Sequence, residues 1–79
     1  MGIALNPMSS ENKILKDFGE ALKKRREEKK LSQEKLAELA SLHRTYIGAV
    51  ERGEKNISLI NLDKLSHAFK IELKELLTF

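Results

Sequence analysis

The segment Ser32–Gly53, SQEKLAELASLHRTYIGAVERG, decides the fold that we predict for this chain. Two short apolar patterns flank a corner at Ser41–Leu42, which indicates two helices joined by a tight turn. Ser32 is a typical N-cap for the first helix, because its hydroxyl can accept a free backbone N–H. His43 starts the second helix, and Gly53 ends it at a position where glycine adopts the left-handed conformation with least strain.

The second of these helices has two different sides when residues are spaced at about 100° around its axis. One side is apolar enough to hold the helix on a core and contains Tyr46, Ile47 and Val50. The other side offers two guanidinium groups, a hydroxyl and two positions almost without side chain: Arg44, Thr45, Gly48, Ala49 and Arg52. A surface with basic ends and a hollow centre can approach a groove of nucleic acid closely, so we predict that this side contacts nucleic acid.

Two residues of this helix have a structural alternative. Gly48 lowers helix stability by about 1 kcal/mol relative to alanine, which close helix packing or close approach to a groove would explain. Its outward position favours the groove. Tyr46 lies at the edge of the apolar side, where its ring can pack on the core while its hydroxyl reaches nucleic acid.

Length and composition limit the classes of protein to consider. A chain of 79 residues forms one small domain, and because such a domain buries only about 60% of its unfolded surface, its core is marginal. The lack of cysteine excludes disulfides and thiolate metal sites and fits a reducing compartment. No apolar run is long enough for a membrane span or a secretory signal. We therefore expect a cytoplasmic protein, associated with the nucleoid if it binds DNA.

The net charge of the chain weakly favours a polyanionic partner. The net charge is only +3, but basic residues gather just before and at the start of the central segment: Lys23, Lys24, Arg25, Arg26, Lys29, Lys30 and Lys35. They form either a solvated helix face balanced by nearby glutamates or a set of phosphate contacts. The second interpretation requires that they share a side of the molecule with Arg44 and Arg52.

Helical patterns outside the central segment predict three further helices. The first spans residues 11–29, the fourth follows an N-cap at Ser58, and a short fifth spans residues 72–77. No strand-like alternation occurs, so the predicted fold class is all-α with five helices. Residues 1–10 lack periodicity and are expected to be disordered, with Met8 as an alternative natural start, and the folded domain spans residues 11–79.

The C-terminal region is more apolar than one small helix requires. Its apolar residues either cap the core of the monomer or form the seam of a homodimer, and a marginal core favours the seam because a twofold interface would extend it. The predicted seam contains Ile60, Leu73, Leu76, Leu77 and Phe79.

The chain offers little to support catalysis or metal binding. His43 and His67 have no companions at the spacing of metal ligands, so we predict no metal site and no cofactor. The hydroxyl residues lack a neighbouring histidine and acid that could activate a nucleophile. We therefore do not expect an enzyme.

Three segments, in order, resemble the Xre or phage-repressor-type helix-turn-helix family. They are LSQEKLA at 31–37, TYIGAVERG at 45–53 and the leucine-rich closing helix, and the resemblance extends over residues 18–77. It implies a five-helix fold like that of the lambda repressor, with DNA as the ligand. The block HRTYIGAVERGEKNISL at 43–59, in so short a chain, is most similar to the controller proteins of restriction–modification systems.

The resemblance implies a dimeric transcription regulator that places its third helix in the major groove of a near-palindromic operator. It implies that Arg44 and Thr45 read bases, with Tyr46 at the groove edge. Gly48 and Ala49, which the helical projection places on the same side, complete the predicted base-reading surface. The phosphate contacts that it implies are Gln33, Arg52, Lys55, Asn56 and Ser58. It also implies that such a protein activates at low dose and represses at high dose from tandem sites, with RNA polymerase as a further partner.

The resemblance also assigns structural roles. It implies a semi-buried ion pair between Arg26 and Glu51 that ties the first helix to the third. Lys30 and Ser41 stand where the family often has glycine, and a left-handed conformation there costs about 1–2 kcal/mol. Arg25 stands where the family is commonly apolar, which suggests an extra phosphate contact or a residue whose stem lies on the rim of the core.

A protein-interaction module, such as an antitoxin-like domain, is the alternative from another class. In that case the same five helices would dock a protein, and affinity for DNA would be incidental. A docking face is expected to carry large apolar anchors, whereas residues 44–52 present arginine, threonine, glycine and alanine. This composition favours DNA.

Overall fold

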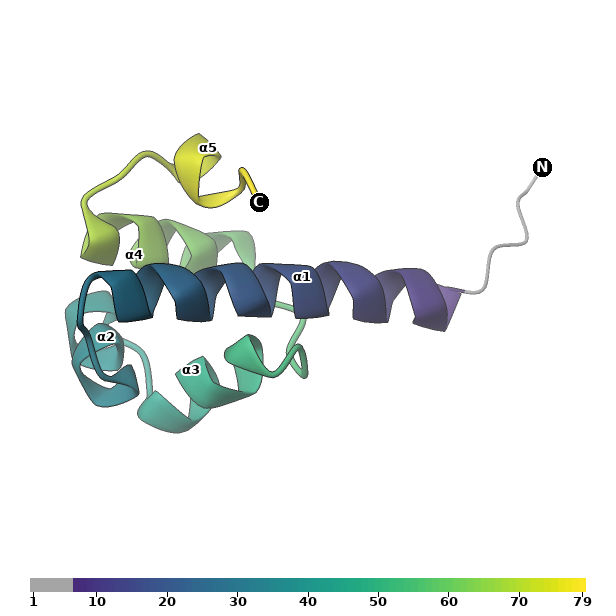
Figure 1. The fold of residues 1–79 in the computed structure, drawn as a ribbon, viewed down its shortest axis with the longest axis horizontal. Helices are drawn as coiled ribbons and strands as arrows, with labels where there is room; N and C mark the ends of the chain where they lie inside the picture. Colours follow the sequence, from purple (N-terminus) through teal and green to yellow (C-terminus); the bar gives the residue numbers. More distant parts are fainter. Residues whose placement is uncertain (1–6) are drawn as a thin grey trace.

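The computed structural model describes the backbone of residues 7–79 and the side chains of residues 13–79. Within that range the chain forms five helices and no strand: α1 (Pro7–Glu28), α2 (Gln33–Ala40), α3 (Arg44–Glu51), α4 (Leu59–Phe69) and α5 (Leu73–Leu76). The predicted all-α class is confirmed. In Figure 1, α2 and α3 lie below the long α1 while α4 and α5 lie above it, and α2 packs against both α3 and α4.

The first helix begins earlier than its apolar stripe predicts. α1 starts at Pro7 rather than at residue 11, so residues 7–10, which we expected to be disordered, are helical. Proline suits a first helical position, because its missing N–H would have no partner inside the helix. The remainder of the predicted disordered segment, residues 1–6, lies outside the described residues.

The predicted caps at Ser32, Ser58 and Gly53 are confirmed. The Ser32 hydroxyl accepts the backbone N–H of Lys35 at 2.9 Å, and the Ser58 hydroxyl accepts that of Asn61 at 3.1 Å. Gly53, with a φ of 75°, is left-handed just beyond α3. These caps set where α2, α3 and α4 begin or end, and with them the position of α3 on the molecule.

Within residues 7–79, three residues other than glycine also adopt the left-handed conformation at helix ends. Lys30 and Ser41 have φ values of 58° and 56°, as expected for positions where the family often has glycine. Lys70, with a φ of 59°, does the same after α4, and no sequence signal predicted it. The chain therefore tolerates some backbone strain at three of its turns.

The core fixes the direction in which α3 faces. Leu22 of α1, Leu36 of α2, Ile47 of α3 and Leu65 of α4 are completely or almost completely buried together. Because α3 contributes Ile47 and Val50 to this cluster, its opposite side faces outward.

A close crossing of α1 and α3 depends on Gly19. A Cβ at this position would lie 2.5 Å from the carbonyl oxygens of both Val50 and Glu51, which is too close for any side chain. The importance of Gly19 does not follow from the sequence, because a glycine inside a helix carries no information about the backbone that crosses it. The crossing brings the end of α3 directly onto α1.

Candidate nucleic-acid interface

Arg44 and Thr45 begin α3 and are both exposed. The buried Ile47 and Val50 hold the opposite side of the helix against the core. The arginine therefore offers a fork of N–H donors to the outside, beside the hydroxyl of the threonine. These are the groups that reading the edges of bases requires.

Gly48 and Ala49 do not form the hollow that the helical projection predicted. Ala49 is only 6% exposed, and Gly48 is also buried. A Cβ on Gly48 would lie 3.2 Å from Nη1 of Arg52 and 3.6 Å from Oε1 of Gln33. The prediction of an exposed hollow is wrong, because a projection of one helix cannot show what neighbouring side chains cover, and close approach to a groove at Gly48 and Ala49 stays a prediction.

The ring of Tyr46 packs on the core, which is the structural role considered for it above. The ring is half-buried, while the hydroxyl accepts a hydrogen bond from Nδ2 of Asn61 at 3.1 Å. Asn61, at the start of α4, was not identified from the sequence. The hydroxyl still has its own hydrogen to donate, but Asn61 fixes where it can point.

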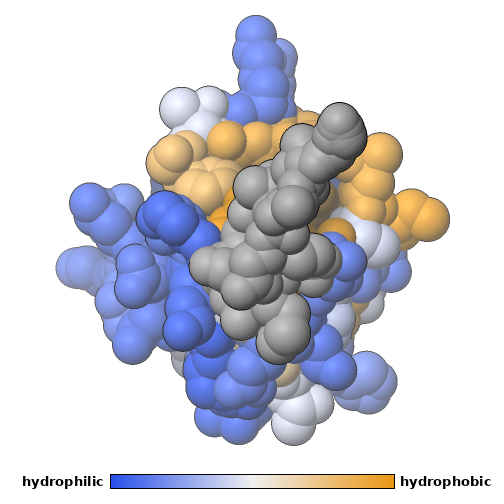
Figure 2. Space-filling model, turned by 90° about the vertical axis from the view of Figure 1, so that its right-hand side faces the viewer, coloured by the Kyte–Doolittle hydropathy of each residue, from blue (hydrophilic) through white to orange (hydrophobic). Residues whose placement is uncertain are grey.

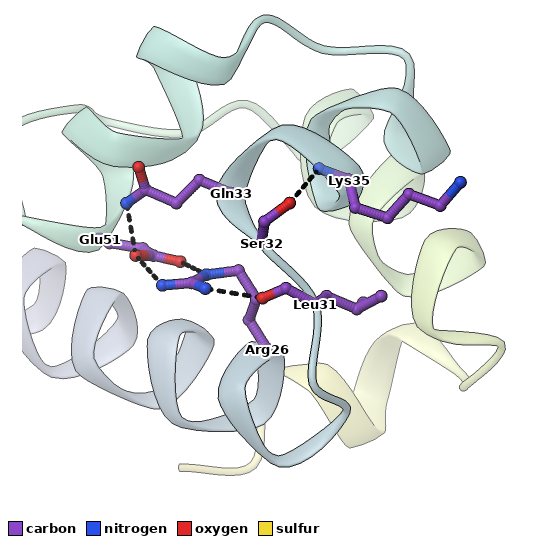
Figure 3. Close-up of polar contacts among 6 residues, drawn as sticks. All are labelled: Arg26, Leu31, Ser32, Gln33, Lys35 and Glu51. Atoms are coloured by element: carbon purple, nitrogen blue, oxygen red, sulfur yellow. Dashed lines mark hydrogen bonds and ion pairs between the residues drawn. The ribbon is translucent and has the colours of Figure 1, made fainter.

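A buried network connects Gln33 to the rest of the fold (Figure 3). The ion pair expected between Arg26 and Glu51 is present, with Nε of Arg26 2.6 Å from Oε2 of Glu51. Nη1 of Arg26 also donates to the Leu31 carbonyl at 2.8 Å, and Nε2 of Gln33 donates to Oε1 of Glu51 at 2.9 Å. The side-chain oxygen of Gln33 points away from Glu51. Gln33 is thus held by its nitrogen at the start of α2.

The hydrogen bonds of this network also stabilise the charged form of Arg26. Hydrogen bonding to Glu51 raises the pKa of Arg26, against the opposing effect of burial. Every buried side-chain nitrogen and oxygen in the described part of the chain has a hydrogen-bond partner. The buried charge is therefore fully compensated, which is the condition under which a buried ion pair is tolerated.

The residues after α3 that are predicted to contact phosphates are all exposed. Arg52, Lys55, Asn56 and Ser58 follow one another along the α3 end and the loop to α4. The Ser58 hydroxyl already accepts one hydrogen bond, because it caps α4. Arg52 already makes two hydrogen bonds, since its Nε and Nη2 donate to the two carboxylate oxygens of Glu54 at 3.0 and 3.1 Å.

Arg25 is not placed with these residues. Its guanidinium carbon lies 6.0 Å from the ring centroid of Phe69, and its Nη2 lies 3.5 Å from the Glu75 carbonyl. These contacts put it on the α4 and α5 side of α1, opposite α3 (Figure 1). The phosphate prediction for Arg25 is wrong: Arg26 faces α3, and the neighbouring residue points about 100° away around the helix. Arg25 instead fits the alternative interpretation, in which its stem lies on the rim of the core.

The predicted dimer seam is partly exposed and partly internal. Leu76 is only 3% exposed, so the seam prediction is wrong for this residue, whereas Leu73 is partly buried against the core and its place in a seam stays a prediction. The turn of α5 points them inward, where they cap the monomer. Ile60 is 70% exposed and Leu77 and Phe79 are also exposed, as is Leu59, which was not predicted.

Apolar residues gather at the end of the molecule where α1 begins. Hydrophobic residues occupy the upper part of this face in Figure 2. They border an apolar groove between α1, the start of α4 and the C-terminus, lined by Ile14, Phe18, Ile57, Leu77 and Phe79 among others. The Phe79 ring meets that of Phe18 edge to face, with centroids 5.5 Å apart.

The described part of the chain contains no cluster of histidine, cysteine, aspartate or glutamate that could hold a metal ion. None of its helices combines the length and apolar character needed to cross a bilayer.

Comparison with known proteins identifies the class to which this fold and its exposed helix belong. A family model described as "Helix-turn-helix" matches residues 22–76. The chain belongs to this helix-turn-helix family, of the Xre type, and is a DNA-binding transcription regulator. The family is regulatory and is not a family of enzymes.

Within the family, the chain is most readily compared with restriction–modification control proteins. It is 46% identical over 69 residues to the control protein C.BamHI of Bacillus amyloliquefaciens, covering 86% of this chain and 85% of that relative. It is 48% identical over 66 residues to the control protein C.MunI of a Mycoplasma species, covering 82% of this chain and 89% of the relative. The predicted resemblance to controller proteins is confirmed.

A solved structure shows the same fold. The restriction–modification controller protein C.AhdI from Aeromonas hydrophila matches with a TM-score of 0.76 and 52% sequence identity. The match covers 78% of this chain and 94% of that one.

Proposed function

We propose that two copies of this protein bind a near-palindromic operator and control transcription in a restriction–modification system. The similarity to control proteins over most of the chain supports the class of target. In this proposal each α3 enters the major groove of one half-site, and the two half-sites lie about 34–36 Å apart. Such a regulator works in the cytoplasm, where its operator is.

The exposed start of α3 carries this proposal. Arg44 and Thr45 are exposed on a helix whose other side is anchored in the core. In our proposal Arg44 forms a bidentate pair with a guanine, and Thr45 contacts the neighbouring base. Tyr46 stands at the edge of the groove, where its hydroxyl is held by Asn61.

Phosphate contacts on both sides of α3 would fix the register. Gln33, at the start of α2, and Arg52, Lys55, Asn56 and Ser58, after α3, flank the exposed start of the helix in the chain. In our proposal the N-terminus of α2 adds backbone N–H groups to the Gln33 contact. These contacts carry no sequence information but supply much of the affinity.

Regulation would follow from occupancy of more than one operator. On tandem sites the same protein would activate at low concentration and repress at high concentration, with RNA polymerase as its partner in the activating state. A reporter gene behind the promoter, measured over a range of protein levels, tests this part of the proposal: a rise followed by a fall supports it, and a monotonic response contradicts it.

Replacing Arg44 tests the role of α3 in base reading. Arg44→Ala should lose preference at one base pair in each half-site, because the bidentate pair with guanine discriminates by about 1–3 kcal/mol. Competition among duplexes that differ at single positions of the operator measures this preference.

Lys24→Ala is the matched control, since Lys24 is a cation on the Arg25 side of α1. It should leave every base preference unchanged. If Arg44→Ala keeps the wild-type preference at all positions, Arg44 does not read a base.

A further inference from the structure

The guanidinium of Arg52 is occupied in the free protein. Its Nε and Nη2 donate to Oε2 and Oε1 of Glu54 at 3.0 and 3.1 Å, which is a bidentate fork. Its remaining terminal nitrogen, Nη1, lies back over Gly48. A carboxylate and a phosphate use the same fork of an arginine, so a DNA phosphate that binds Arg52 through this edge must displace Glu54.

The backbone holds Glu54 close to Arg52. Gly53 between them takes the left-handed conformation, and the N–H of Glu54 donates to the Ala49 carbonyl at 2.9 Å. The carboxylate is more than half exposed and lies on the same surface as the guanidinium. The hydrogen bonds from Arg52 lower the pKa of Glu54, so the carboxylate stays charged at neutral pH.

The other cations of this surface differ from Arg52. Within the described side chains, residues 13–79, neither Arg44 nor Lys55 takes part in a salt bridge. Lys55 attracts the Glu54 carboxylate only through space, so among the charged phosphate contacts proposed for α3 and its following loop, Arg52 is the one that a carboxylate holds in a salt bridge.

We infer that Glu54 acts as an internal competitor for phosphate and sets the DNA affinity of the protein by holding Arg52. The inference rests on the proposed function only in that Arg52 meets a phosphate. Because phosphate contacts are independent of sequence, Glu54 lowers affinity for specific and non-specific duplexes alike. Glu54 is a positioning residue that acts through Arg52, without contact to the bases.

Four proteins test this inference: the wild type, Glu54→Gln, Arg52→Gln and the double variant. Their affinities for an operator duplex and for a random-sequence duplex are measured by fluorescence anisotropy at several salt concentrations. Glu54→Gln should bind both duplexes more tightly by about twofold to fivefold, the range expected for an exposed ion pair. In the Arg52→Gln background the same change should shift affinity less than about 1.5-fold, because the two residues act as a pair.

Glu20→Gln, an exposed carboxylate on the Arg25 side of α1, is the control for removing one negative charge, and it should change affinity far less. An equal gain from Glu54→Gln in both backgrounds would show general charge repulsion and overturn the inference. Weaker binding by Glu54→Gln would also overturn it, since Glu54 would then orient Arg52 productively.

The result separates this inference from the proposed function. If the wild type does not prefer the operator duplex, the proposed function fails, while the random-sequence duplex still measures the effect of Glu54. If the preference is present and Glu54→Gln does not tighten binding, only the inference fails.

Discussion

Arg26 is the residue on which the geometry of the interface depends most. Its guanidinium joins α1 to Glu51 of α3 and to the Leu31 carbonyl before α2, and Glu51 in turn holds Gln33. One buried charge thus connects α2 and α3, which present the proposed DNA contacts, to α1. A buried ion pair of this kind is weak evidence for stability, but removing one partner leaves the other charge uncompensated.

Glu51→Gln should therefore lower the free energy of unfolding by about 3–5 kcal/mol, because it keeps the shape of Glu51 but leaves Arg26 buried without a countercharge. Urea unfolding followed by circular dichroism measures the loss. In the same assay Glu54→Gln, which removes an exposed carboxylate, should change stability by less than about 0.5 kcal/mol. A loss below about 1 kcal/mol for Glu51→Gln would mean that solvent reaches Arg26 and that the network does not hold the helices together.

Among the helices, two glycines meet different surroundings. Gly19 lets α1 touch the backbone of α3, whereas the atoms nearest to a Cβ at Gly48 are the flexible ends of Arg52 and Gln33. Gly19 cannot accept a methyl group without moving a helix. Gly48 can accept one if the guanidinium of Arg52 shifts slightly, since Gln33 already lies at an ordinary contact distance.

Gly19→Ala should therefore destabilise the fold by at least about 1–3 kcal/mol, as overpacking does in a closely packed interior. Gly48→Ala should stay within about 1 kcal/mol of the wild type, because alanine favours the helix by that amount while Arg52 has to shift. Thermal unfolding of the two variants side by side tests the contrast. Equal losses would show that α1 and α3 do not cross as closely as the structure has them.

The helix ends and the exposed start of α3 could be predicted from the sequence. The helix ends at Ser32, Ser58 and Gly53 follow from local chemistry, since capping involves a residue and its near neighbours in the chain. The exposure of Arg44 and Thr45 on α3 also follows from the sequence, because the apolar side of that helix is continuous.

Features that depend on a second element could not be predicted. Ala49 and Gly48 are buried because other parts of the fold cover the edge of α3, which a projection of a single helix omits. Arg25 faces α4 and α5 because its neighbour Arg26 is drawn to α3 by Glu51. The pair between Arg52 and Glu54 follows no helical spacing, since the left-handed Gly53 stands between them.

The whole molecule is small and leaves apolar surface uncovered at one end. Ile60, Leu59 and Phe79 are more than half exposed near the start of α4 and the C-terminus. A homodimer through this surface would extend a marginal core and set two copies of α3 at a fixed distance. Symmetry of the protein would then appear as symmetry of the operator.

Selection of binding sites from random duplex DNA tests whether a dimer of this protein reads bases through α3. The wild type should recover two inverted half-sites centred about 34–36 Å apart, each with a guanine for Arg44. Ile60→Asp, which places a charge on the proposed dimer surface, should recover single half-sites, while Leu39→Asp on α2, an exposed apolar residue away from that surface, should keep the pair. Recovery of no common sequence, or of an unsymmetrical site by the wild type, would contradict the account of a dimer that reads DNA through α3.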